Sequence, residues 1–92
     1  MNLQDALLNW LQLALVAEAR PGDEAARQGL EFFETILRED HGVSSVSIQN
    51  RDATFITVSF TSGSKTKTQL FAREDAELLL TSLASNPKYL EE

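Results

Sequence analysis

Apolar residues recur at three- and four-residue steps through residues 3–18, the spacing that gathers them on one face of an α-helix. The stripe consists of Leu3, Leu7, Trp10, Leu11 and Ala14. Leu8 and Leu15 lie roughly 100° or more away from it on a helical wheel, so the apolar arc of this helix is unusually wide. Arg20-Pro21-Gly22 interrupts the pattern and ends the predicted helix.

A second helix is predicted over residues 23–41, with Asp23 and Glu24 in the first turn, where the helix dipole favours acids. Its main apolar stripe is Ala26, Leu30, Phe33 and Leu37, with Phe32 and Ile36 beside it. The sequence pairs Arg27 with Glu31 and Glu34 with Arg38 at i,i+4 spacing on the outer face. Gly42 follows directly, and we expect it to form a left-handed C-terminal cap.

The period then changes from 3.6 to 2, which is typical of half-buried strands. We predict strands over residues 44–49, 54–61 and 65–71. A turn at Asn50-Arg51-Asp52 joins the first two strands, and a turn at Thr61-Ser62-Gly63-Ser64 joins the second and third. The third strand is polar enough to be an edge, and Lys65 and Lys67 suit an edge that must avoid chance pairing.

A third helix is predicted over residues 73–85, with acids crowding its start and Asn86-Pro87 stopping it. Residues 86–92 form a tail. Phe71, at the end of the third strand, is placed to brace the start of this helix against Ala76.

The predicted order is therefore α-α-β-β-β-α. A three-stranded antiparallel meander needs cover for its apolar face, and the helices supply it. The expected fold is a two-layer α+β sandwich. The covered face would carry Val46, Ile48, Ile56, Val58 and Phe60. The exposed sheet face would carry Phe55, Thr57, Lys65 and Lys67.

Length and composition narrow the class of protein. The 92 residues, 42% of them apolar, allow one domain over residues 1–92. The sequence holds no cysteine, which excludes a disulfide scaffold, a thiolate metal site and a cysteine nucleophile. The first 19 residues hold no lysine or arginine, and no apolar run approaches the ~20 residues that a bilayer span needs. We therefore expect a cytoplasmic protein.

Charge is unevenly distributed along the chain, which carries a net charge of −6. Residues 1–42 hold eight acids and three bases, whereas residues 43–71 hold one acid and three bases. The negative segments coincide with the predicted helices. A negative surface repels phosphate backbones and anionic lipid, so nucleic acid and membranes are disfavoured as partners.

The candidate chemistry is sparse. His41 is the only histidine, and a zinc site needs three or four convergent ligands, so we interpret it as a structural residue at a helix end. Ser62-Gly63-Ser64 lacks the spacing of a phosphate loop and is interpreted as a hairpin turn. The helix acids are interpreted as a solvated face, and no cofactor or metal is implied.

The wide apolar arc of the first helix carries the functional hypothesis. A small domain has little surface on which to hide so many leucines, and exposed leucines commonly bind a partner. The candidate interface is Leu8, Leu11, Leu15 and Trp10. We therefore expect a non-enzymatic protein-binding or regulatory module that forms a homodimer through this helix; the alternative reading is that the second helix covers both sides of the arc.

Two other functions are weighed against this one. An acidic inhibitor could mimic nucleic acid on a basic protein partner, and its candidate acidic face is Glu31, Glu34, Glu74 and Glu77. A small enzyme ranks last, because the chain lacks cysteine, a second histidine and any recognisable catalytic spacing.

Overall fold

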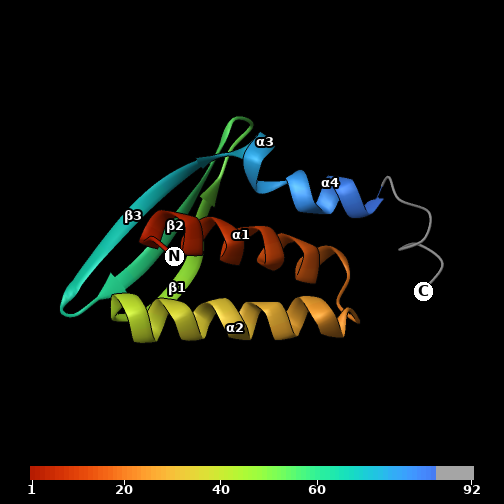
Figure 1. Cartoon of the computed structure of the whole chain (residues 1–92). Helices are drawn as coiled ribbons and strands as arrows, with labels where there is room; N and C mark the ends of the chain where they lie inside the picture. The colour runs from red at the N-terminus through yellow and green to blue at the C-terminus, as the bar shows by residue number, and fades with distance from the viewer. Residues whose placement is uncertain (85–92) are drawn as a thin grey trace.

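The computed structural model describes residues 1–84 and has the predicted α+β architecture (Figure 1). Two long helices precede a three-stranded sheet, and two short helices follow it. The elements are α1 (Leu3–Ala19), α2 (Glu24–His41), β1 (Val43–Arg51), β2 (Phe55–Ser62), β3 (Lys65–Ala72), α3 (Arg73–Ala76) and α4 (Leu78–Ala84). The predicted stop at Asn86-Pro87 and the predicted tail over residues 86–92 lie outside the described residues.

Both long helices begin at side-chain caps. The Asn2 side chain accepts a hydrogen bond from the Asp5 amide (2.7 Å), and the Asp23 side chain accepts one from the Ala26 amide (3.0 Å). These bonds satisfy amides that have no partner inside the helix. The predicted cap at Gly42 is confirmed: its φ is 67°, and its amide donates to the Arg38 carbonyl at 3.1 Å.

The strands form an antiparallel sheet in the order β1-β2-β3. The β2–β3 hairpin turns through two residues, Gly63 and Ser64, so that Ser62 pairs with Lys65. Gly63 has a φ of 64°, which glycine adopts without strain. The β2–β3 register is regular along its whole length, whereas β1 is interrupted by two irregularities in its pairing with β2.

The turn between β1 and β2 lies later than predicted. Asn50 and Arg51 belong to β1, because the pairing shifts between Ile48 and Asn50 and the strand continues beyond that bulge. Asp52 then makes the turn, since its carboxylate accepts hydrogen bonds from the amides of Thr54 (2.8 Å) and Phe55 (2.7 Å).

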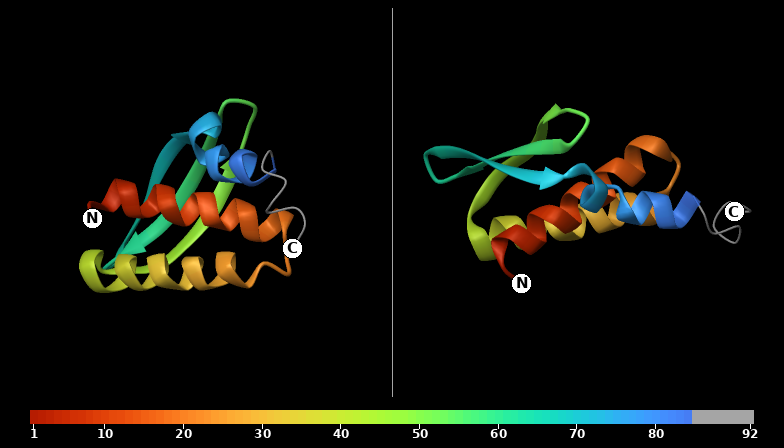
Figure 2. Two further views of the ribbon diagram at one scale, coloured as in Figure 1. Left: turned by 45° about the vertical axis from the view of Figure 1, so that its right-hand side comes forward. Right: turned by 90° about the horizontal axis from the view of Figure 1, so that it is seen from above.

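The helices cover one face of the sheet and leave the other bare (Figure 2). α1 lies in the middle of the helical layer, with α2 on one side and α3 and α4 on the other (Figure 1). The core fills the space between α1 and the sheet. Its fully buried larger side chains are Leu7, Leu11, Val16, Leu37, Ile56 and Val58. Val46 and Ile48, which we expected on the covered face, pack against this core in partly buried positions.

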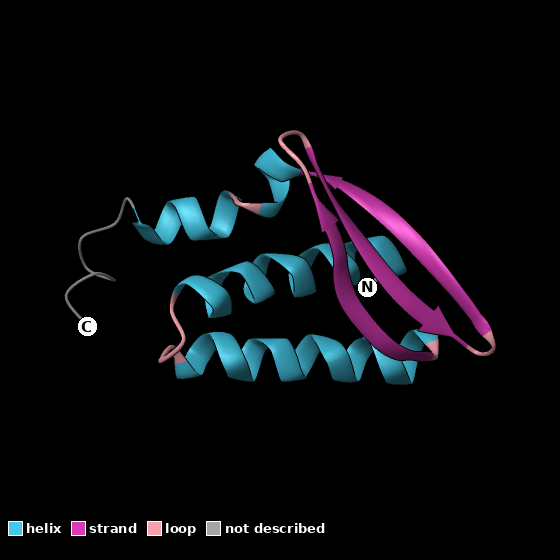
Figure 3. Ribbon diagram, turned by 180° about the vertical axis from the view of Figure 1, so that it is seen from behind, coloured by secondary structure: helices cyan, strands magenta, loops and turns pink. Residues whose placement is uncertain are grey.

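The predicted third helix is not continuous. It is two short helices, α3 and α4, separated at Glu77, whose φ and ψ are −92° and 0° (Figure 3). Two side chains hold the bend. Gln12 donates to the Asp75 carbonyl at 3.0 Å, and Arg73 donates to the Glu77 carboxylate at 3.1 Å. Ala76, at the end of α3, is completely buried and belongs to the same core cluster as Phe71, the residue expected to brace it.

Candidate functional site

The residues predicted to form an interface on α1 lie mostly in the core of the single chain. Leu11 is 0% exposed, Leu15 is 5% exposed and Trp10 is 6% exposed, while Leu8 is partly buried and packs against the core. The prediction of an exposed α1 interface is therefore wrong for Leu11, Leu15 and Trp10, while Leu8 keeps part of its surface in solvent. The physical reason is that α1 is the central helix, so the sheet and the neighbouring helices enclose most of its circumference.

The exposed sheet face also differs from the prediction, in β3. Register pairs Lys67 with Phe60 and Lys65 with Ser62, so both lysines share the face of the buried Phe60 and Phe71. Because the β2–β3 hairpin projects beyond the helices (Figure 2), these lysines remain exposed although they belong to the helix-covered face.

The bare face is therefore uncharged. Its apolar centre is Phe55 (42% exposed) and Leu70 (52% exposed), and Leu70 pairs directly with Thr57. Thr61 and Thr66 also pair on this face, with their hydroxyl oxygens 3.1 Å apart. Of the four predicted residues, only Phe55 and Thr57 lie on this face.

The predicted acidic face does not form one surface. Glu31 and Glu34 belong to α2, whereas Glu74 and Glu77 lie beyond α1 at the other side of the helical layer. Two of the four carboxylates are engaged within the chain. Glu34 accepts a hydrogen bond from the Trp10 indole (3.0 Å), and Glu77 accepts one from Arg73.

The two predicted i,i+4 pairs on α2 are replaced by other contacts. Arg27 pairs with Glu24 (3.3 Å), one turn nearer the helix start, and Arg38 donates to the Thr35 hydroxyl (3.5 Å). The Trp10 indole competes successfully for Glu34, because a largely buried indole N–H requires an acceptor.

The outer side of α2 carries a second apolar stripe. Its members recur at steps of four, three and four residues, one position before each member of the stripe that faces α1. We call this set the α2 outer stripe: Ala25, Gly29, Phe32 and Ile36. Phe32 is 59% exposed and lies edge-on to Phe33, with ring centroids 5.1 Å apart. A large aromatic side chain thus stands in solvent at the centre of a helical seam.

A groove continues the α2 outer stripe towards α4. It has a volume of about 500 Å³ and includes Ala25 from the stripe, Leu13 from α1 and Leu79 from α4. The Leu13 side chain also reaches over Gly29, where an added Cβ would meet its Cδ1 at 2.8 Å. The stripe and the groove therefore form one apolar surface.

Acids stand at both ends of the α2 outer stripe. Asp23 and Glu24, at the start of α2, pair with Arg20 and Arg27. At the other end, the carboxylates of Glu39 and Asp40 form no hydrogen bond or ion pair with any residue of the described part of the chain.

The bases of α2 point elsewhere. Arg27 and Arg38 lie roughly 120–140° around the helix from Phe32, and Arg38 lines a separate groove against β1. α1 contributes two acids and no base. The surface around the stripe is consequently negatively charged near the carboxyl end of α2.

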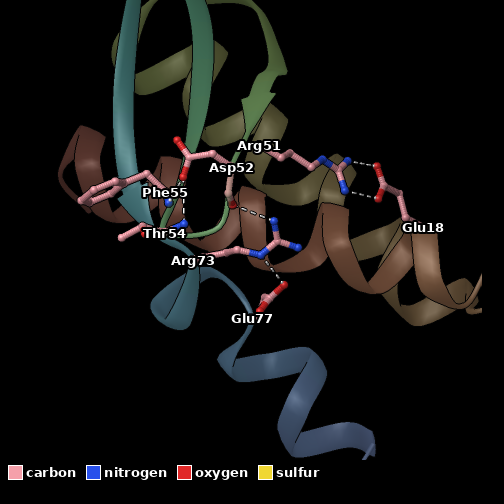
Figure 4. A network of polar contacts seen from close by, with 7 residues as sticks. All are labelled: Glu18, Arg51, Asp52, Thr54, Phe55, Arg73 and Glu77. Carbon is pink, nitrogen blue, oxygen red and sulfur yellow. Dashed lines mark hydrogen bonds and ion pairs between the residues drawn. The ribbon is translucent and has the colours of Figure 1, made fainter.

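A polar network surrounds the β1–β2 turn, at the end of the sheet away from the β2–β3 hairpin (Figure 4). Arg51 at the end of β1 forms a two-pronged ion pair with Glu18 of α1, with one N–O distance of 2.8 Å. The hydrogen bonds from Arg51 hold the pKa of Glu18 below its usual value. Arg73 donates to the Asp52 carbonyl (2.9 Å), and the Phe55 and Thr54 amides lower the pKa of the Asp52 carboxyl. This network joins α1, the β1–β2 turn and α3, and we assign it a structural role.

His41 lies at the end of α2, with its Nε2 3.1 Å from the Met1 carbonyl oxygen. No group of three potential ligands among His, Cys, Asp and Glu gathers anywhere in residues 1–84. Within the same span, no helix combines the length and the apolar character that crossing a bilayer requires.

No protein-family model matches the sequence, and neither a curated protein nor a solved structure matches the chain.

Proposed function

We propose that this chain is a non-enzymatic protein-binding module that binds an amphipathic helix of a partner on the α2 outer stripe. The exposure of Phe32, 59% of whose surface is in solvent at the centre of a four-three-four stripe, carries the proposal. Helices that dock in this way present apolar anchors at the same spacing. The groove beside Leu13 and Leu79 would receive an anchor from the partner.

Charge complementarity supports a basic partner. The unpaired carboxylates of Glu39 and Asp40 favour lysine or arginine at the end of the partner helix that lies over them. A second copy of this chain is a poorer occupant for the same surface, because two such helices would bring their acids together. An inhibitor that mimics nucleic acid has less support, since Glu34 and Glu77 are engaged within the chain.

The test uses a labelled synthetic helix of about 20 residues, long enough to form several turns. It carries leucine at four-three spacing and lysine at its flanks, and a matched peptide carries glutamate at the flanks. We expect saturable binding of the lysine peptide, followed by fluorescence anisotropy, and binding at least about tenfold weaker for the glutamate peptide.

Two variants locate the site. Phe32→Glu should weaken binding of the lysine peptide at least about tenfold, since it removes the central anchor. Phe55→Glu places the same change on the bare sheet face and should leave binding intact. Glu39→Lys with Asp40→Lys should also weaken binding, whereas Glu74→Lys with Asp75→Lys, which changes the net charge equally, should have little effect. Equal binding by the Phe32→Glu and Phe55→Glu variants would overturn the proposal.

Other occupants give different results in the same assay. A synthetic peptide of residues 85–92 that displaced the lysine peptide would identify the chain's own segment as the occupant. Loss of self-association in Phe32→Glu would identify a second copy. Either result replaces the basic partner helix.

A further inference from the structure

We propose that the free edge of β3 pairs in antiparallel fashion with β3 of a second copy, so that two sheets join into one of six strands. This surface is separate from the α2 outer stripe, and the inference does not depend on the proposed function. The proposed dimer forms through the sheet edge and not through α1, where the sequence predicts it, because α1 is enclosed.

The two edges of the sheet differ in their capacity to pair. β1 has two irregularities in its register and packs against α2, which are both means of blocking an edge. β3 runs from Lys65 to Ala72 without proline and with a regular register with β2. Lys65 and Lys67 guard this edge against chance pairing, but they leave it open to a strand that brings acids opposite them. Figure 1 shows β3 as the outermost strand, with β2 on one side and no further strand of the described chain on the other.

The backbone groups of β3 that point outward can be identified. The two-residue turn makes Ser62 and Lys65 a hydrogen-bonded pair. The Arg73 amide, eight residues after Lys65, donates to the Thr54 carbonyl at 2.8 Å, so it also points towards β2. Every second residue from Lys65 onwards therefore directs its backbone groups towards β2. The outward amides and carbonyls therefore belong to Thr66, Thr68, Leu70 and Ala72.

An apolar cluster lies at this edge. Leu70 is 52% exposed on the bare face, and Phe55 is its diagonal neighbour on β2. An added strand would cover Leu70 from the side. Pairing of the backbones would thus also bury apolar surface.

Charge complementarity between the two ends of β3 favours antiparallel pairing of the two copies. Lys65 and Lys67 lie at the hairpin end of β3, while Glu74 and Asp75 follow its other end, and none of these four charged groups has a partner in residues 1–84. A two-fold axis near the middle of β3 brings the lysines of one copy towards the acids of the other. A parallel arrangement would instead stack lysine on lysine.

The test is a charge swap followed by sedimentation velocity. Lys65→Glu with Lys67→Glu should raise the dimer dissociation constant at least about tenfold, and so should Glu74→Lys with Asp75→Lys. A mixture of the two variants should form a heterodimer at wild-type strength, because both contacts are then complementary. All four side chains are exposed, and circular dichroism of each variant checks its fold.

Amide hydrogen exchange gives an independent readout. Raising the concentration of the wild-type chain should slow exchange at Thr66, Thr68 and Leu70, and leave Lys67 and Gln69 unchanged. A wild-type chain that stays monomeric to about 1 mM, or a heterodimer no stronger than either variant alone, would overturn the inference. The charge swap leaves the α2 outer stripe untouched, so failure here is distinct from failure of peptide binding.

Discussion

The two long helices lie side by side, yet their apolar residues meet different surroundings. α1 is apolar around much of its circumference, and it is enclosed by the sheet, by α2 and by the short helices. α2 packs mainly against α1 and β1, and its second stripe remains in solvent around Phe32. The number of neighbouring elements therefore decides which helix exposes apolar side chains. α1 is the more apolar of the two, yet it is the more deeply buried.

Truncating an apolar side chain on each helix provides the sharpest contrast. Leu11→Ala on α1 should lower the free energy of unfolding by about 2–5 kcal/mol, since Leu11 is completely buried. Phe32→Ala on α2 should change it by no more than about 0.5 kcal/mol. Urea denaturation followed by circular dichroism measures both. Comparable losses would mean that Phe32 belongs to the core.

The helix caps should show a smaller difference. Asp23→Ala should destabilise the chain by about 1 kcal/mol, because the Ala26 amide loses its acceptor. Asn2→Ala should cost no more than this on α1, whose enclosed surface holds the helix in place without the cap. Thermal unfolding of the two variants ranks them, and a larger loss for Asn2→Ala would contradict the view that packing dominates α1.

Ion pairs should show the smallest difference. Because Arg51 lowers the pKa of Glu18, this pair contributes stability above the usual pKa of a glutamate, and the contribution is lost as pH falls through the lowered value. Both side chains are partly exposed, so the effect should be below about 1 kcal/mol. Urea midpoints of the wild type and Glu18→Gln, compared between about pH 7 and pH 3, should converge at the acid end.

Arg27→Gln serves as the matched control on α2. Its pair with Glu24 is more exposed and joins residues of one helix, so its removal should be close to neutral. A larger loss in Arg27→Gln than in Glu18→Gln would reverse the expected order.

Periodicity predicted the elements well because each apolar stripe is a local property. The two long helices, the three strands and the Gly42 cap follow from local spacing and residue type. The fold class is confirmed for the same reason.

The errors arise where a residue's surroundings come from distant segments. The alternation in β3 was identified correctly, but its face was not, because Phe71 shows that the lysines share the buried side. Leu15 could not be assigned to the core without knowing that α1 is central. Near the break at Glu77, the Asp75 carbonyl accepts a hydrogen bond from Gln12, which lies more than sixty residues earlier in the chain.

The exposed centre of the α2 outer stripe had a visible signal in the sequence. Phe32 and Ile36 stand one position before Phe33 and Leu37, so α2 holds two parallel stripes. What the sequence lacked was the number of helices available to cover them. Only the arrangement of the layer shows that Phe32, at the centre of this stripe, is left exposed in the described chain, whereas Gly29 is met by Leu13 and Ile36 packs partly against the core.

The central position of α1 has a consequence for biosynthesis. α1 leaves the ribosome before the strands and the short helices that enclose it. With two charged residues in seventeen, α1 is also the less charged of the two long helices. Until those elements have emerged, the leucines of α1 can pack only against α2, so the incomplete chain exposes apolar surface that the finished fold buries.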